Sequence, residues 1–152
     1  MIPMSRFQQI QGAFLGPVGR ASLLVLFTFL LTVFCLARSM EPDPRGYGTH
    51  RQLGLPECTF QMLFSIPCPG CGMTTSFSHF VRGDLWDAAR VSISGLLLAI
   101  VATVVIPWSL ASAVRGRLLG IKDPSIVGAR LVITLGGISL VNWLCRLWSS
   151  TL

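Results

Sequence analysis

The sequence has little charge for its length. Asp, Glu, Lys and Arg make up 12% of its 152 residues, whereas 52% of the residues are hydrophobic. A soluble domain usually carries about twice that charged fraction, so the composition predicts a chain solvated by lipid. A chain this short leaves little room for a second domain, and we expect one membrane domain over residues 1–152.

Acidic residues, lysine and several catalytic motifs are scarce or missing. Six acidic residues and a single lysine, Lys122, leave a net charge of +6 that comes almost wholly from arginine. The arginines lie near the ends of apolar segments and form no basic stripe, so we expect no nucleic-acid partner. The chain also has no Gly-rich phosphate loop, no HExxH sequence and no Ser-His-Asp spacing, which removes the sequence signals of three large enzyme classes.

Three apolar stretches are long enough to cross a bilayer. They cover residues 18–37, 91–114 and 126–148. The first contains Arg20 near its start and is followed by Arg38. The third contains Arg130 and Arg146 near its ends, where long arginine side chains can reach the interface. The sequence therefore predicts an all-α integral membrane protein with three transmembrane helices, whose first partner is the lipid bilayer.

The first apolar stretch has a rival interpretation as a cleaved signal peptide. A leader of 20 residues precedes the stretch, and Leu36-Ala37-Arg38 is a poor small-x-small cleavage site. We therefore predict an uncleaved span. In the second span, Gly95, Ala99 and Thr103 recur every four residues and predict a helix face that a neighbouring helix can approach closely. Pro107 removes a backbone donor there and predicts a kink.

The distribution of positive charge predicts the orientation of these spans. Basic residues tie at six on each side, but the short connection over residues 115–124 holds three of them in ten positions. Short connections rich in Arg and Lys stay on the cytoplasmic side. We therefore expect a multi-pass protein of the inner (plasma) membrane with a cytoplasmic N-terminus, so that the loop over residues 38–90 lies outside.

This loop divides into two parts. Residues 39–57 are rich in Pro, Gly and charge, and they predict an exposed segment without much regular structure. Residues 58–82 are mostly apolar and hold three of the five cysteines. The apolar part predicts a helical or re-entrant loop folded against the bilayer, with one short helix after Cys58 and a second from Met73. Gly83 should end the second helix.

The sequence Cys68-Pro69-Gly70-Cys71 joins these two helices. Pro at the second position and Gly at the third predict a type II turn, which brings its first and fourth Cα atoms within about 7 Å. That separation suits a disulfide, and it also suits two thiolates on one metal ion. Beyond Gly83, Asp84 is predicted to cap a further helical stretch over residues 85–90 that runs into the second span.

Residues 57–105 resemble a known family. The motif Cys-Pro-Gly-Cys-Gly-Met-Thr, an upstream Cys, and Gly83-Asp84-Leu85 with Ala88 before a transmembrane helix are similar to the bacterial membrane-protein family called domain of unknown function 2752. The resemblance implies a small multi-span protein with no established activity, and it picks out the three loop cysteines. The chain departs from the family in having Thr75 where members usually have Arg, and Ser92-Ile93 in place of Asn-Pro.

The three loop cysteines allow several hypotheses. In the first, Cys58, Cys68 and Cys71 bind a metal ion, with His79 as a fourth ligand, because structural zinc sites commonly use three Cys and one His. His79 lies eight residues after Cys71, which nearly returns to the same helix face. Alternatively, two of the three thiols form a structural disulfide, or all remain reduced and buried. We expect Cys35 and Cys145 to be buried and reduced.

The remaining hypothesis is a membrane thiol–disulfide oxidoreductase that uses Cys68 and Cys71, with Cys58 as the resolving thiol. Cys71 precedes a predicted helix, whose dipole would lower the pKa of its thiol. The βαβ context of thioredoxin-like motifs is missing, however. We therefore expect a non-enzymatic subunit or scaffold, with other membrane proteins as further partners. The hydroxyl-rich run from Thr74 to Ser78 either lines a polar cavity or bonds back to its own helix.

Overall fold

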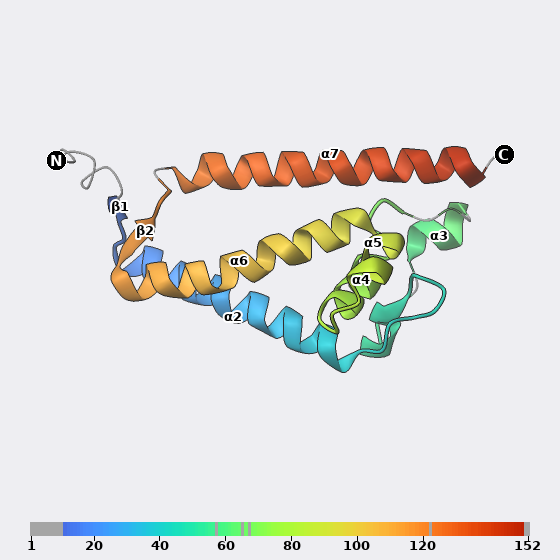
Figure 1. Cartoon of the computed structure of the whole chain (residues 1–152), viewed down its shortest axis with the longest axis horizontal. Helices are drawn as coiled ribbons and strands as arrows, with labels where there is room; N and C mark the ends of the chain where they lie inside the picture. Colours follow the sequence, from blue (N-terminus) through green and yellow to red (C-terminus); the bar gives the residue numbers. More distant parts are fainter. Residues whose placement is uncertain (1–10, 57, 65, 67, 122, 151–152) are drawn as a thin grey trace. The chain divides into compact units, whose positions relative to one another are not determined.

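The computed structural model describes residues 11–56, 58–64, 66, 68–121 and 123–150 (Figure 1). Of these described residues, 73% are helical. Its long helices are α2 (Pro17–Ser39), α6 (Ile93–Arg115) and α7 (Pro124–Ser150). All three are long and apolar enough to cross a membrane, which confirms the predicted class and the predicted spans to within a few residues.

Most apolar side chains of these helices are exposed, as contact with lipid requires. In α7, none of the apolar window is buried, whereas 28% of the window in α6 is buried. The difference arises because Gly95 and Ala99 of α6 lie in the protein interior, as the four-residue spacing predicted. Thr103, the third member of that predicted face, is exposed. α6 continues through Pro107, and the predicted kink stays a prediction.

The chain forms two compact units. One comprises Met1–Thr32 with Val101–Leu131, and the other comprises Val33–Ile100 with Val132–Leu152. Each long helix contributes residues to both units, because every unit boundary falls inside a helix. The expectation of one membrane domain over residues 1–152 stays a prediction.

The first unit contains a pair of strands that the sequence did not predict. β1 (Gln11–Phe14) pairs antiparallel with β2 (Arg117–Leu119), and the Leu15 N–H extends the pairing by donating to the Gly116 carbonyl at 3.0 Å. The residues before α2 therefore lie beside the connection that follows α6. Between these two segments the chain contains two membrane-length helices, α2 and α6. If both helices cross a membrane, the two segments lie on the same side of it.

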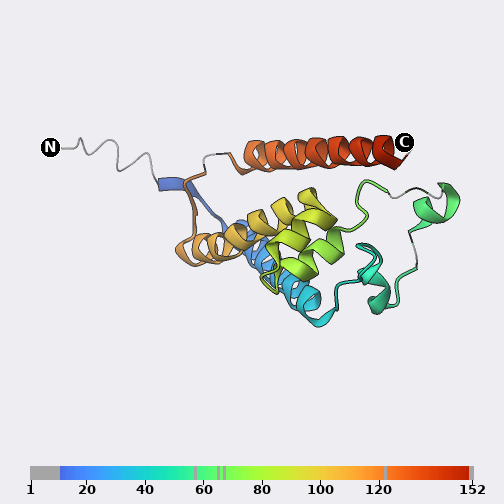
Figure 2. The same cartoon turned by 45° about the vertical axis from the view of Figure 1, so that its right-hand side comes forward.

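The second unit holds the short elements between α2 and α6. They are the 3₁₀-helix η1 (Thr49–Leu53), α3 (Thr59–Phe64), α4 (Met73–Phe80) and α5 (Leu85–Val91) (Figure 2). The helices predicted after Cys58 and from Met73 are confirmed. α4 ends shortly before Gly83, whose φ of 89° is incompatible with a right-handed helix. Asp84 is at the N-cap position of α5, and its carbonyl accepts the Ala88 N–H at 2.9 Å, but its side chain makes no capping hydrogen bond, so the predicted side-chain cap is wrong.

Residues 39–56 are more ordered than the sequence predicted for this segment, because η1 docks on α4. Thr49 of η1 is fully buried, and its Oγ1 lies 2.8 Å from Oγ1 of Thr75, which is also fully buried. The Thr49 hydroxyl also accepts the Asp43 N–H at 3.1 Å. A composition rich in Pro, Gly and charge hid this contact, since a single buried threonine has no periodicity to reveal it.

The two serine hydroxyls of α4 also bond outward rather than back to their own helix. Ser76 Oγ donates to the Ala88 carbonyl at 2.9 Å, which joins α4 to α5. Ser78 Oγ donates to the carbonyl of Met40, just after α2, at 2.5 Å. Both serines are fully buried. The hydroxyl-rich run therefore joins α4 to its neighbours through satisfied polar contacts.

Arg82 closes the end of α2. Its guanidinium donates to the carbonyls of Ala37 at 3.2 Å, Arg38 at 3.0 Å and Met40 at 2.7 Å, and also to the carbonyl and hydroxyl of Ser78. The last carbonyls of a helix have no partner within the helix, and a span that ends at a membrane boundary has little water to supply one. One arginine thus supplies donors to the end of α2 and links it to α4.

Replacing Arg82 should destabilise the protein strongly. We expect Arg82→Ala to lower the free energy of unfolding by about 2–4 kcal/mol, because several carbonyls lose a charged donor. Denaturant titration in detergent micelles measures the change. Arg90→Ala is the matched control, since Arg90 is exposed and its guanidinium lies 5.2 Å from the centre of the Trp86 ring. The control should lose less than about 1 kcal/mol, and equal losses in the two variants would contradict this account.

Candidate metal site

Residues 68–71 between α3 and α4 form a turn, as predicted, but the turn is of a different type. The Cys71 N–H donates to the Cys68 carbonyl at 3.0 Å. A type II turn needs a positive φ at Gly70, and the positive φ, 90°, lies instead at Gly72, the N-cap of α4. The predicted type II turn is therefore wrong. The Gly70 carbonyl accepts the Met73 N–H at 3.2 Å, so the chain passes directly from one turn into the next and into α4.

Gly72 takes this conformation where three segments meet. A Cβ atom at Gly72 would lie 2.9 Å from the Gly46 carbonyl oxygen and 3.0 Å from Cγ1 of Val91. The position therefore requires both a left-handed backbone and the absence of a side chain. At Gly70, by contrast, an added Cβ would meet nothing closer than the Met73 sulfur, at 3.9 Å.

The two glycines of the turn should respond differently to a methyl group. Gly72→Ala should lower the free energy of unfolding by more than about 1 kcal/mol, from the left-handed backbone alone. Gly70→Ala should leave it unchanged or raise it by up to about 1 kcal/mol. Both changes are measured by denaturant titration of the purified variants in the same detergent. A larger loss from Gly70→Ala than from Gly72→Ala would contradict the observed turn.

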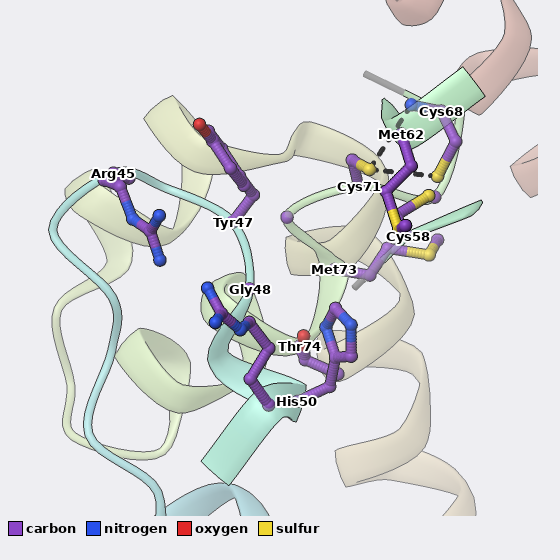
Figure 3. Close-up of a pocket in the computed structure, with 13 residues that line it drawn as sticks. Arg45, Tyr47, Gly48, His50, Cys58, Met62, Cys68, Cys71, Met73 and Thr74 are labelled. Atoms are coloured by element: carbon purple, nitrogen blue, oxygen red, sulfur yellow. Dashed lines mark hydrogen bonds between the residues drawn. The ribbon is translucent and has the colours of Figure 1, made fainter. Parts of the chain in front are cut away.

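The structure brings the three loop cysteines together. The sulfur atoms of Cys58, Cys68 and Cys71 all lie within 4.8 Å of one another (Figure 3). The Cys68 thiol donates to the Cys71 sulfur at 3.0 Å, and the Cys68 N–H donates to the same sulfur at 3.3 Å. All three side chains are half-buried, so the group remains accessible to a small ion.

Two contacts with α7 hold the elements that carry these thiols. Phe60 of α3 packs edge-on against Trp143, with ring centroids 6.2 Å apart. Ser139 Oγ donates to the carbonyl of Pro69, inside the turn, at 3.0 Å. Cys58 itself begins α3, because its carbonyl accepts the Met62 N–H at 3.0 Å. The cysteine loop, residues 58–82, is therefore packed against a membrane-length helix, and its predicted position against the bilayer stays a prediction.

His79 is not part of this group, although it was predicted as the fourth ligand. It lies near the end of α4, where its Nδ1 is 3.8 Å from a carboxylate oxygen of Asp84. The eight-residue spacing from Cys71 would place both residues on one face only within a continuous helix. α4 begins at Met73, after the left-handed Gly72, so the helical register does not extend back to Cys71.

A cavity of about 390 Å³ adjoins the three thiols. Its lining includes Met62 and Met73 from the cysteine loop, and Arg45, Tyr47, His50 and Arg51 from the segment that precedes it. The chain has only two histidines, His50 and His79. His50 was missed in the sequence because seven residues, including Gly54 and Pro56, separate it from Cys58, which obscures any ligand spacing.

The Cys71 thiol is protonated at neutral pH. Burial raises its pKa to about 12, and hydrogen bonding with the neighbouring Cys68 and Cys58 thiols adds to the increase. The lowered pKa predicted from the helix dipole is therefore wrong. Its physical reason is that burial, the largest influence on this thiol, disfavours the charged thiolate. A neutral Cys71 is a poor nucleophile, since the thiolate is the reactive form.

The other two cysteines differ from the prediction in one respect. Cys35 and Cys145 are free thiols outside the group of three, as predicted, but both are exposed rather than buried. They lie on α2 and α7, two helices whose apolar surface suits contact with lipid. Each is a small apolar residue on a lipid-facing helix, and each offers a cysteine control for experiments on the loop.

The fold and the site define a class of protein: it is helical, it has three membrane-length helices, and one loop gathers three thiols. The family model described as a protein of unknown function, domain of unknown function 2752, matches residues 58–106. This match confirms the resemblance over about a third of the chain, from the first cysteine of the group into α6. Comparisons with curated proteins and with solved structures gave no match.

Proposed function

We propose that this protein is a non-enzymatic integral membrane protein, a subunit or scaffold, whose cysteine loop binds a metal ion of the zinc class. The supporting observation is the convergence of Cys58, Cys68 and Cys71. Three thiolates at about 2.3 Å from a tetrahedral zinc ion lie about 3.8 Å apart. The sulfurs lie between 3.0 Å and 4.8 Å apart, so small side-chain movements would fit them around one ion.

A metal ion uses all three thiols, whereas a disulfide uses two and leaves one unpaired. The ion would join α3 to the turn before α4, in a unit whose buried apolar cluster is small. That cluster consists of Ala37, Phe77 and Ala99 with a few half-buried neighbours. Structural zinc supplies folding free energy where a hydrophobic core is limited. The proposed role of the ion is therefore to hold the loop in one conformation that a partner protein can recognise.

The alternative function is a thiol–disulfide oxidoreductase that uses Cys68 and Cys71. Their sulfurs are 3.0 Å apart, so a bond between them would need little movement. Both functions require Cys71 to ionise, because the thiolate is the nucleophile in one and the metal ligand in the other, so its raised pKa acts against both equally. The two functions make different demands on Cys58, which is one of three metal ligands in the first and a resolving thiol outside the Cys68–Cys71 pair in the second.

Metal analysis of cysteine variants tests the proposal. Protein purified in detergent under reducing conditions should retain about one zinc ion per chain, measured by mass spectrometry of the metal. Cys58→Ser, Cys68→Ser and Cys71→Ser should each weaken zinc binding at least about 10-fold. Cys35→Ser and Cys145→Ser, the matched controls, should not. A wild-type protein that binds no zinc but carries a reversible disulfide between Cys68 and Cys71 would support the alternative.

We also propose that the protein lies in the inner (plasma) membrane with its N-terminus in the cytoplasm. Support comes from the basic connection after α6 and from the pairing of β1 with β2, which joins the N-terminal residues to that connection. Alkaline phosphatase, which is active only outside the cytoplasm, should be active when fused at Pro44 and inactive when fused at Gly120. The reverse pattern would overturn this orientation.

A further inference from the structure

His50 lies on the wall of the cavity that the three thiols share. It is the second residue of η1, and Figure 3 shows its ring pointing from η1 into the cavity on the side of Met73. Its Nε2 lies 3.2 Å from the carbonyl oxygen of Pro56, two residues before Cys58. With Nε2 at this carbonyl, Nδ1 is the nitrogen that would bind a metal ion. His50 lies outside the group of ligand atoms within 4.8 Å of one another, so its ring would have to move across the cavity toward the three sulfurs.

The location of His50 follows from a buried contact of the residue beside it. Thr49 is fully buried against Thr75 of α4, with their hydroxyl oxygens 2.8 Å apart. α4 is the helix that follows Cys71 and Gly72 directly. One hydroxyl pair thus fixes η1 relative to the cysteine turn, and the next residue along η1 presents an imidazole to the cavity.

The other residues that line this cavity offer weaker zinc ligands. Among the described lining residues, the remaining side-chain donors are the thioethers of Met62 and Met73 and the hydroxyls of Tyr47 and Thr74, and none is a carboxylate. Zinc binds thiolate and imidazole, whereas thioethers suit monovalent copper better. An imidazole is also neutral, so it would add no charge to three thiolates that already exceed the charge of a divalent ion. The guanidinium of Arg51 lines the same cavity and would offset the remaining negative charge.

We propose that His50, rather than His79, completes a Cys₃His zinc site with Cys58, Cys68 and Cys71. This inference rests on the proposed function, that the loop binds a metal ion. With four protein ligands the site is closed and structural, since catalytic zinc keeps a position for water or substrate. The ion would then join η1 to α3 and to the turn, so that loading the site would order the whole loop between α2 and α4.

The two histidines provide a matched pair of variants. In reduced protein in detergent micelles, zinc affinity is measured by competition with a chromogenic chelator. His50→Ala should weaken binding at least about 10-fold, because even residues that only support metal ligands change affinity 10- to 100-fold. His79→Ala should bind zinc as tightly as the wild type. His50→Cys should restore tight binding, and its cobalt complex should show stronger thiolate-to-cobalt absorption than the wild-type complex, since a fourth sulfur replaces nitrogen.

The outcomes distinguish the role of His50 from the proposal that the cysteine loop binds a metal ion. Zinc binding that survives His50→Ala unchanged, or that is lost in His79→Ala, overturns the role of His50 and leaves the metal-binding loop standing. A loss confined to Met73→Leu overturns it as well, in favour of a thioether ligand. A wild-type chain that binds no zinc overturns both statements. Thermal unfolding of the metal-free variants checks that His50→Ala folds, and His50→Cys supplies the gain of function that a misfolded chain cannot give.

Discussion

The contact between Arg82 and the end of α2 is the interaction on which the second unit depends. A helix that spans a membrane must leave its last carbonyls near the boundary, and this chain does not leave them to water. Arg82 donates to three of these backbone oxygens, and Ser78 of the preceding turn donates to one of them as well. α4 is thereby fixed to α2, and the elements that carry the thiols are built on α4.

The loop itself is assembled by small polar contacts rather than by a large apolar core. Thr49, Ser76 and Ser78 are fully buried, and each makes a hydrogen bond to a different segment. A buried hydroxyl without a hydrogen-bond partner destabilises the fold, so losing one of these contacts would weaken the packing of the segments that the others join. The three sulfurs meet at one end of this arrangement, in the part of the loop that rests on α7 through Phe60 and Pro69. A metal ion bound there would add the one strong interaction that the loop otherwise lacks.

The sequence predicted what depends on local composition and periodicity, and it failed where distant segments meet. Length and hydrophobicity were sufficient for the three long helices, and the spacing around Cys58 and Met73 was sufficient for α3 and α4. The convergence of the cysteines was predicted correctly because a turn and a short helix limit how far they can separate. His79 was a wrong choice, since helical spacing was counted across a turn that is not helical. The partner of α4 in the segment 39–57 had no signal in the sequence, because it depends on one threonine.

Position 75 illustrates how one side chain shapes a neighbouring segment. Thr75 is completely enclosed beneath η1, and its hydroxyl oxygen lies 2.8 Å from that of Thr49. A long cationic side chain at position 75 would displace η1 and carry its own charge into the space that the hydroxyl pair now fills. The path of the chain after α2 therefore depends on a short residue in a different helix, and a segment grafted in place of residues 43–56 would have to keep a hydroxyl opposite position 75.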